Sequence, residues 1–403
     1  MLAEEVLIAR QPIFDRANGL TAYELLFRPE HGALVDSASP EVATAVVSVR
    51  SVMDIGLDEL VGPVRAWVNF SRTALTEEHF RVLPPERVVL EVLESVVADA
   101  EVLRALRSAR TAGYQIALDD YVLNERTAGL LEFADFVKLD MLGRSEAGLV
   151  DDLRSIARPG LRILAEKVET RAVHDAALDA GFHLFQGYYF ARPDIVPGRR
   201  MPTDRNALLR LLSELQDPAT TFERIETLIA ADVGLGVRLL RHVNAVYFGV
   251  RERIESLRHA VVMLGTERLR TCVAMILMAD LDGKPGELVT MALVRAHMCE
   301  KLGERMHGLP DRYFSVGLFS LLDAFVDRPL GEIVERLGLS KELSNALLLH
   351  EGALGDSLRA VEACERADWS ALEGGSCSAT DLRDCYLEAL RWSGQVRSSL
   401  AAD

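Results

Sequence analysis

Side chains able to bind a metal ion or a phosphate-like anion recur after short apolar runs in the first half of this 403-residue chain. The run QIAL is followed by Asp119 and Asp120, and the run RVVL is followed by Glu91. The other residues in equivalent places are Glu24, Asn69, Lys138, Glu166 and Gln186. Carboxylate and amide oxygens are the ligands of Mg²⁺ and Mn²⁺, whereas zinc prefers nitrogen and sulfur. The residue types therefore predict a site for a hard divalent cation.

Such a site suits the chemistry of phosphate esters. Two divalent cations about 3.5–4 Å apart activate a water molecule and stabilise the leaving oxygen of a phosphodiester. Lys138 would orient or deprotonate that water, or hold a phosphate group. An Asp or Glu after a strand also serves as an ordinary turn residue or helix N-cap. The Asp119–Asp120 stretch alone leaves both interpretations open.

The elements that must position these residues alternate between strand-like and helix-like stretches. The apolar runs lie at residues 65–71, 87–94, 115–121, 135–141, 161–169 and 182–190. Helix-like segments between them end at Gly113 and Gly181, as glycine commonly ends helices. Repeated strand–helix units predict a parallel sheet and favour a closed (β/α)8 barrel, whose strand ends meet on one rim. An open doubly wound sheet is the alternative, although no GxGxxG turn supports it.

The pattern changes in the second half of the chain. A Pro-rich linker is predicted at residues 196–206, between a barrel over 1–195 and a second domain over 207–403. Beyond the linker, Leu208, Leu211 and Leu212 follow helical spacing, and no strand pair is evident after residue 205. The fold class predicted is thus α/β plus all-α.

Composition excludes several classes of partner. The net charge of −16 argues against a broad surface for DNA or RNA. No run approaches 18 apolar residues, so no membrane span is expected, and the amino terminus does not resemble a signal peptide. The five cysteines form no CxxC motif, which favours a reducing compartment. We therefore expect a cytoplasmic protein.

Seven short motifs, in this order, resemble those of the EAL domain over about residues 5–195. The motifs are AYELLFRP, WVNFS, LEVLE, ALDDY, FVKLD, LAEKVE and FQGYYFARP. The resemblance implies a (β/α)8 barrel that hydrolyses cyclic di-GMP to linear pGpG with Mg²⁺ or Mn²⁺.

The resemblance also implies roles for individual residues. The metal ligands would be Glu24, Asn69, Glu91 and Asp119, with Asp120 at a second metal site. The catalytic residues would be Lys138, Glu166 and Glu24, supported by Glu169. The residues that contact the dinucleotide would be Gln11, Arg28 and Gln186.

Three departures from the family pattern bear on activity. The signature Glu-Ala-Leu is here Glu24-Leu25-Leu26, and a family glycine is replaced by Lys167. In the family, a glycine-containing loop after the paired aspartates is associated with metal-site order and dimer contacts. Residues 121–126, which stand in its place here, have a different sequence without glycine. Glycines permit positive φ angles that other residues rarely adopt. These changes leave open a catalytically inactive receptor that senses the nucleotide, or a scaffold that acts through protein–protein interactions.

The second half resembles the HDOD domain, a helical relative of HD phosphohydrolases. The matching stretches are AADVGLGVRLLRHVNAVYFG, IESLRHAVVMLGTERLR and FSVGLFSLLDAF. Together the halves resemble bacterial EAL–HDOD signalling proteins of the YuxH-like group. No histidine after residue 200 precedes an aspartate, and Asp323 follows Leu322, so this half is predicted to be non-catalytic and to bind an unidentified protein partner. The pair His174-Asp175 is expected on the solvated face of a barrel helix. The sequence is also compatible with a homodimer.

Overall fold

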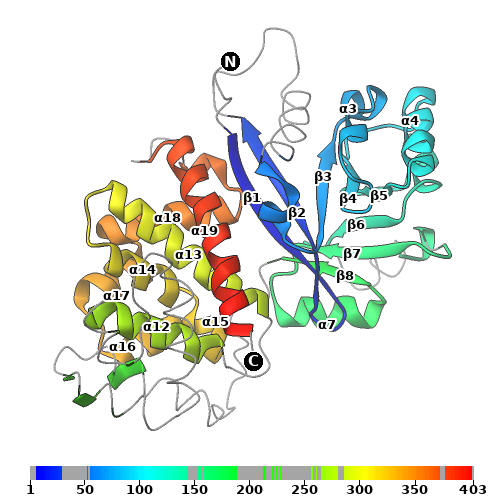
Figure 1. Ribbon diagram of the computed structural model, residues 1–403. Helices are drawn as coiled ribbons and strands as arrows, with labels where there is room; N and C mark the ends of the chain where they lie inside the picture. Colours follow the sequence, from blue (N-terminus) through cyan, green and yellow to red (C-terminus); the bar gives the residue numbers. More distant parts are fainter. Residues whose placement is uncertain are drawn as a thin grey trace. The chain divides into compact units, whose positions relative to one another are not determined.

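The computed structural model describes a chain of two compact units (Figure 1). The described residues are 6–29, 55–142, 153–156, 158–187, 265–279, 286–372 and 377–401, with isolated positions elsewhere. One unit holds Met1–Tyr189, Cys364–Glu373 and Ser378–Arg383, and the other holds Phe190–Ala363, Gly374–Cys377 and Asp384–Asp403. The predicted linker, residues 196–206, lies outside the described residues, so the boundaries at 195 and 207 stay predictions.

The strands of the first unit close into a barrel in chain order, which confirms the predicted fold class. They are β1 (Val6–Asp15), β2 (Leu20–Pro29), β3 (Arg65–Phe70), β4 (Val88–Val92), β5 (Gln115–Leu118), β6 (Phe136–Asp140), β7 (Arg162–Glu166) and β8 (Leu184–Gln186). Neighbouring strands from β2 to β8 are parallel, but β1 is antiparallel to both β2 and β8. This strand departs from the predicted parallel order.

A short turn explains the reversal of β1. Parallel neighbours need a long crossover connection, whereas residues 16–19 allow only a hairpin. The Asp15 carboxylate closes this turn by accepting hydrogen bonds from the backbone N–H groups of Ala17 and Gly19, each at 2.8 Å. Asn18 takes a left-handed conformation there, with φ of 62°.

Helices follow most of the strands, and local residues set their ends. The helices between its strands include α2 (Leu57–Val61), α3 (Arg72–Thr76), η1 (His79–Val82), α4 (Ala100–Thr111), α5 (Ala128–Leu131) and α7 (Arg171–Ala180). Asp99 caps α4 by accepting from the backbone N–H groups of Glu101 and Val102. Gly181 ends α7 with φ of 98°, as predicted. The expectation for His174 on α7 is wrong, because this side chain is buried and packs on Phe185.

The barrel interior is filled by a layer to which each strand contributes one apolar side chain. Its members are Ile13, Ala22, Trp67, Val89, Ala117, Phe136, Leu164 and Leu184. The rings of Trp67 and Phe136 pack with centroids 4.7 Å apart. Because the barrel centre is packed, chemistry is confined to the mouths.

The described residues of the second unit form helices and no strand, as predicted. Its helices are α12 (Thr266–Ala279), α13 (Gly286–Arg305), α14 (Pro310–Phe319), α15 (Leu322–Val326), α16 (Leu330–Leu337), α17 (Lys341–Leu349), most of α18 (Gly352–Glu365) and most of α19 (Ala379–Ala401), whereas η3 (Trp369–Leu372) belongs to the first unit. At Gly317 of α14 an added Cβ would lie 2.6 Å from the Ala296 Cα, so α13 and α14 pack closely there. In the described part of the chain, no helix is both long and apolar enough to cross a bilayer.

Candidate active site and metal centre

A layer of polar side chains lies directly above the apolar layer of the barrel. Side chains on a strand alternate between faces, so residues two apart share the interior. Moving two positions from each apolar member toward the same mouth gives Gln11, Glu24, Asn69, Glu91, Asp119, Lys138, Glu166 and Gln186. For β1, which runs in the opposite direction, this step leads from Ile13 back to Gln11. The structure thus brings together residues that are dispersed over the sequence.

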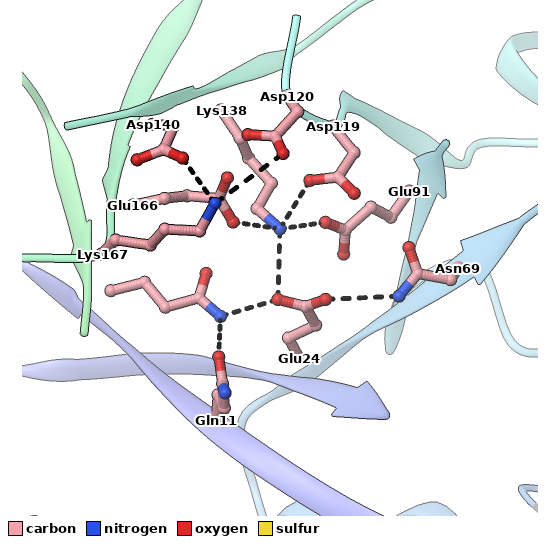
Figure 2. A network of polar contacts seen from close by, with 11 residues as sticks. Gln11, Glu24, Asn69, Glu91, Asp119, Asp120, Lys138, Asp140, Glu166 and Lys167 are labelled. Atoms are coloured by element: carbon pink, nitrogen blue, oxygen red, sulfur yellow. Dashed lines mark hydrogen bonds and ion pairs between the residues drawn. The ribbon is translucent and has the colours of Figure 1, made fainter. Parts of the chain in front are cut away.

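Lys138 lies at the centre of this layer (Figure 2). Its Nζ lies 3.1 Å from Glu24 Oε2, 3.0 Å from Asp119 Oδ1 and 2.7 Å from Glu166 Oε1. It also pairs with Glu91 Oε1. The side chain of Lys138 is 1% exposed and that of Glu91 is 0% exposed, so this is a buried ionic cluster. Four carboxylates facing one ammonium leave an excess of acidic groups.

Amide side chains extend the cluster across β1, β3 and β8. Glu24 accepts a hydrogen bond from Asn69 Nδ2 at 3.2 Å and another from Gln186 Nε2 at 2.6 Å. The same Gln186 nitrogen lies 2.9 Å from Gln11 Oε1. These bonds fix the orientation of the Glu24 carboxylate and lower its pKa together with Lys138, although burial alone would raise that pKa.

The excess of acids shows in their pKa values. Burial and the nearby Glu24 carboxylate raise the pKa of Glu91 well above its usual value, against the opposing effect of Lys138. Burial also raises the pKa of Asp119, and it raises the pKa of Glu166 to about 8. Burial would lower the pKa of Lys138, but the surrounding carboxylates raise it well above its usual value. The cluster therefore favours additional positive charge, supplied by protons or by a metal ion.

A second group of charged residues lies at the mouth. Lys167 Nζ is 2.5 Å from Asp140 Oδ2 and 4.0 Å from Asp120 Oδ2 (Figure 2). Asp140 was missed in the sequence analysis, although it stands two residues beyond Lys138 and so continues the same inward alternation.

The donor set fits a hard divalent cation. Among the described residues, the buried atoms without a hydrogen-bond partner include Asn69 Oδ1, Glu91 Oε2, Asp120 Oδ1 and Gln186 Oε1. Such oxygens are the ligands that Mg²⁺ and Mn²⁺ require. No three His, Cys, Asp or Glu side chains in the described ranges are arranged to bind one ion together, since the Lys138 ammonium lies between the carboxylates. A metal ion would therefore need this ammonium to move.

The sequence also predicts site roles for Arg28 and Glu169. Arg28 lies in β2, but its side chain lies outside the described residues. Glu169 follows β7 on the connection to α7 and is half-buried. The structure therefore does not test their assignment.

The rewritten loop after Asp120 is closed on itself without glycine. Thr127 donates its hydroxyl to Val122 O at 2.6 Å, and the Asn124 side chain accepts from Arg126 N at 2.9 Å. Tyr121 is buried, and its backbone N–H donates to Lys138 O at 3.2 Å, which ties the loop to β6. Side-chain hydrogen bonds of Asn and Thr thus provide the turn.

Comparison with known proteins gives two family matches and close relatives along the whole chain. Residues 68–193 match the sequence model of the EAL domain, and residues 201–326 match that of the HDOD domain. The uncharacterized protein YuxH of Bacillus subtilis (strain 168) is 31% identical over 399 residues, which cover 96% of this chain and 98% of YuxH. The cyclic di-GMP phosphodiesterase CdgJ of Vibrio cholerae is 32% identical over 399 residues, which cover 96% of this chain and 92% of CdgJ. Among solved structures, a calcium and cy-diGMP complex of Klebsiella pneumoniae BlrP1 is 22% identical, with a TM-score of 0.39 over 47% of this chain and 56% of that chain.

Proposed function

Since this chain belongs to the family of proteins that join an EAL domain to an HDOD domain, we propose that its barrel hydrolyses cyclic di-GMP with Mg²⁺ or Mn²⁺. The observation that carries this proposal is the convergence of Glu24, Glu91, Asp119 and Glu166 on one point inside the barrel mouth. Holding these acids together without enough positive charge is unfavourable, so the cluster favours cations. The name of the relative CdgJ, a cyclic di-GMP phosphodiesterase, supports the choice of substrate.

The metal ligands in this proposal are Glu24, Asn69, Glu91, Asp119 and Asp120. A bound divalent cation supplies Lewis acidity, which makes water more acidic and withdraws charge from the phosphoryl oxygens. The amide of Asn69 orients Glu24, and Gln186 holds the other oxygen of the same carboxylate. The binding geometry is thus fixed by residues that are rigid parts of strands.

Lys138 and Glu166 would act on the water that attacks phosphorus. Glu166, whose Oε1 lies 2.7 Å from Lys138 Nζ, would accept the proton of that water. The water oxygen bonds to phosphorus, the bond from phosphorus to one ribose oxygen breaks, and the water proton passes to that leaving oxygen. The product is linear pGpG. Gln11, Arg28 and Gln186 would contact the dinucleotide.

The direct test is turnover by the purified full-length chain with Mg²⁺ or Mn²⁺, followed by product analysis. Glu91→Gln should lower the rate of hydrolysis more than about 100-fold, because it removes a proposed metal ligand. Glutamine mimics the protonated form that burial already favours at Glu91, so the fold should survive this substitution. The matched control is Glu94→Gln, on an exposed residue just after the same strand, and it should leave the rate unchanged. Absence of turnover in the wild type at saturating metal would contradict the proposal.

A receptor is the second candidate function. Two lysines already contact the proposed metal ligands, and the loop over residues 121–126 departs from the family pattern. In this alternative, cyclic di-GMP binds at the barrel mouth without being hydrolysed. Calorimetric titration with the nucleotide separates the cases: binding without turnover supports a receptor, and no binding supports a scaffold.

The helical unit would then act as a protein-binding module. Two of its described histidines lie beside carboxylates: His297 Nδ1 is 2.8 Å from Glu300 Oε2, and its ring stacks on Trp392 with centroids 4.6 Å apart. His350 lies 3.4 Å from Glu362. We propose an unidentified protein partner for this unit and a homodimer for the chain, and light scattering of the full-length protein tests the latter.

A further inference from the structure

The backbone of Lys167 is held in a conformation that lysine rarely adopts. Its φ angle is 55°, in the left-handed region. Backbone hydrogen bonds fix both flanking residues: Glu166 O accepts from Met141 N at 3.2 Å, and Val168 N donates to Gln186 O at 3.0 Å. Contacts from Met141, just after β6, and from Gln186, the last residue of β8, thus impose the conformation of Lys167.

The next strand reinforces this constraint. At Gly187, an added Cβ would lie 2.3 Å from Val168 O, so the segment after β8 packs directly against the segment after β7. A residue held in the left-handed region costs about 1 kcal/mol or more, and it persists only where its surroundings leave no alternative. The position of Lys167 at the mouth is therefore determined by the barrel and not by its own preference.

The side chain of Lys167 extends across the mouth to two carboxylates (Figure 2). Its Nζ lies 2.5 Å from Asp140 Oδ2 and 4.0 Å from Asp120 Oδ2. The hydrogen bond that Lys167 donates to Asp140 raises the pKa of Lys167, so the side chain is a cation at neutral pH. Asp120 is the outermost of the proposed metal ligands, and its buried Oδ1 has no hydrogen-bond partner among the described residues.

We propose that Lys167 is a built-in competitor of the divalent cation at the Asp119–Asp120 side of the mouth, and that it sets how much metal the protein needs. This inference rests on the proposed function, because it requires Asp120 to bind a divalent cation. An ammonium beside Asp120 repels a divalent ion at the same carboxylate and neutralises part of its charge. The neighbouring Asp140 holds the ammonium in place.

The expected effect follows from the partial exposure of this pair. The side chains of Lys167 and Asp120 are 46% and 42% exposed, so solvent screens their interaction strongly. Replacing Lys167 by methionine keeps the length of the side chain and removes the charge. We expect this change to tighten Mn²⁺ binding about tenfold, and Lys167→Arg to leave binding within about twofold of the wild type.

The experiment is calorimetric titration of Mn²⁺ into the full-length chain without nucleotide, for the wild type, Lys167→Met, Lys167→Arg and Glu91→Gln. Tighter binding by Lys167→Met alone supports the inference, as does binding by Lys167→Met when the wild type binds nothing. Equal or weaker binding by Lys167→Met, with wild-type binding that Glu91→Gln abolishes, would overturn the inference and leave the proposed function intact. No binding by either the wild type or Lys167→Met would overturn the proposed function itself. Lys167→Gln serves as the second uncharged variant if Lys167→Met fails to fold.

Discussion

Each unit of the chain buries a cation, but the two cations have different surroundings. Lys138 of the barrel is 1% exposed and contacts four carboxylates. Arg295 of the helical unit is 5% exposed at its side chain and lies 2.9 Å from Ser320 Oγ and 3.4 Å from Glu362 Oε1. Negative charge thus exceeds positive charge around Lys138, whereas Arg295 contacts a hydroxyl and the Glu362 carboxylate and interacts with the charge of Asp323.

This difference separates a site from a structural pair. A buried ion pair is tolerated when its charges balance and its hydrogen bonds are satisfied. The cluster around Lys138 exceeds this balance and leaves Glu91 Oε2 without a hydrogen-bond partner among the described residues. Surplus buried oxygens therefore indicate where a ligand is expected, and buried charge alone does not.

The largest effect is expected when Lys138 is replaced by methionine. Four carboxylates would remain without their ammonium, two of them almost fully buried, and the barrel should lose about 3–5 kcal/mol of stability. Mn²⁺ should restore much of this loss, since it can replace the missing charge. Urea unfolding in a Trp369→Phe, Trp392→Phe background, in which Trp67 reports on the barrel, measures both. If Lys138→Met loses the same stability with and without Mn²⁺, the carboxylates around Lys138 do not bind the cation, and the contrast with Arg295 is lost.

Replacing Arg295 by methionine should cost less, about 3 kcal/mol, because it removes the cation that pairs with Glu362 and interacts with Asp323. His350 Nε2 lies 3.4 Å from the other oxygen of Glu362. Mn²⁺ should not restore stability here. The unfolding of the helical unit can be followed through Trp392, which packs on His297. Rescue by metal would show that this network is also a cation site.

The smallest effect concerns pH and Asp323 of α15. Burial raises the pKa of Asp323 to about 6 from its usual 3.8. The folded state therefore holds more protons than the unfolded state between about pH 4 and 6, and its stability falls as pH rises through that window. Asp323→Asn should remove this dependence, with a difference on the order of 2 kcal/mol between pH 4 and pH 7.

Urea unfolding of the helical unit at several pH values measures this dependence. The matched control is Asp356→Asn, which removes a carboxylate that is 51% exposed in the same unit. If the wild type and Asp323→Asn show parallel curves between pH 4 and 7, the buried carboxyl does not titrate as described.

Much of the barrel and its polar layer could be predicted from the sequence. Alternation along strands and the common rim of parallel strands are local rules, and they brought Glu91, Asp119 and Glu166 together correctly. Glu24 lies in the middle of a long strand, where it faces the interior because it stands two positions beyond Ala22 of the apolar layer. Gln11 could be placed only once the direction of β1 was known.

Other features depend on contacts between distant segments and could not be read from spacing. The ammonium of Lys138 lies between the carboxylates because the long side chain extends across the barrel interior. The spacing of residues in the sequence does not show how far a side chain extends. The conformation of Lys167 is set by backbone bonds of its flanking residues to Met141, just after β6, and to Gln186 of β8. His174 is buried because it packs on Phe185 of β8, a neighbour that helical periodicity on α7 does not reveal.

The pairing of β1 with β8 makes the polar layer a late product of folding. Ile13 pairs with Gln186, and Gln11 meets Gln186 across 175 positions of chain. During synthesis this ladder has to wait until the last barrel strand has left the ribosome, and contacts so distant along the chain form slowly. A small molecule that binds the assembled layer would stabilise the closed barrel and lower the population of its opened forms.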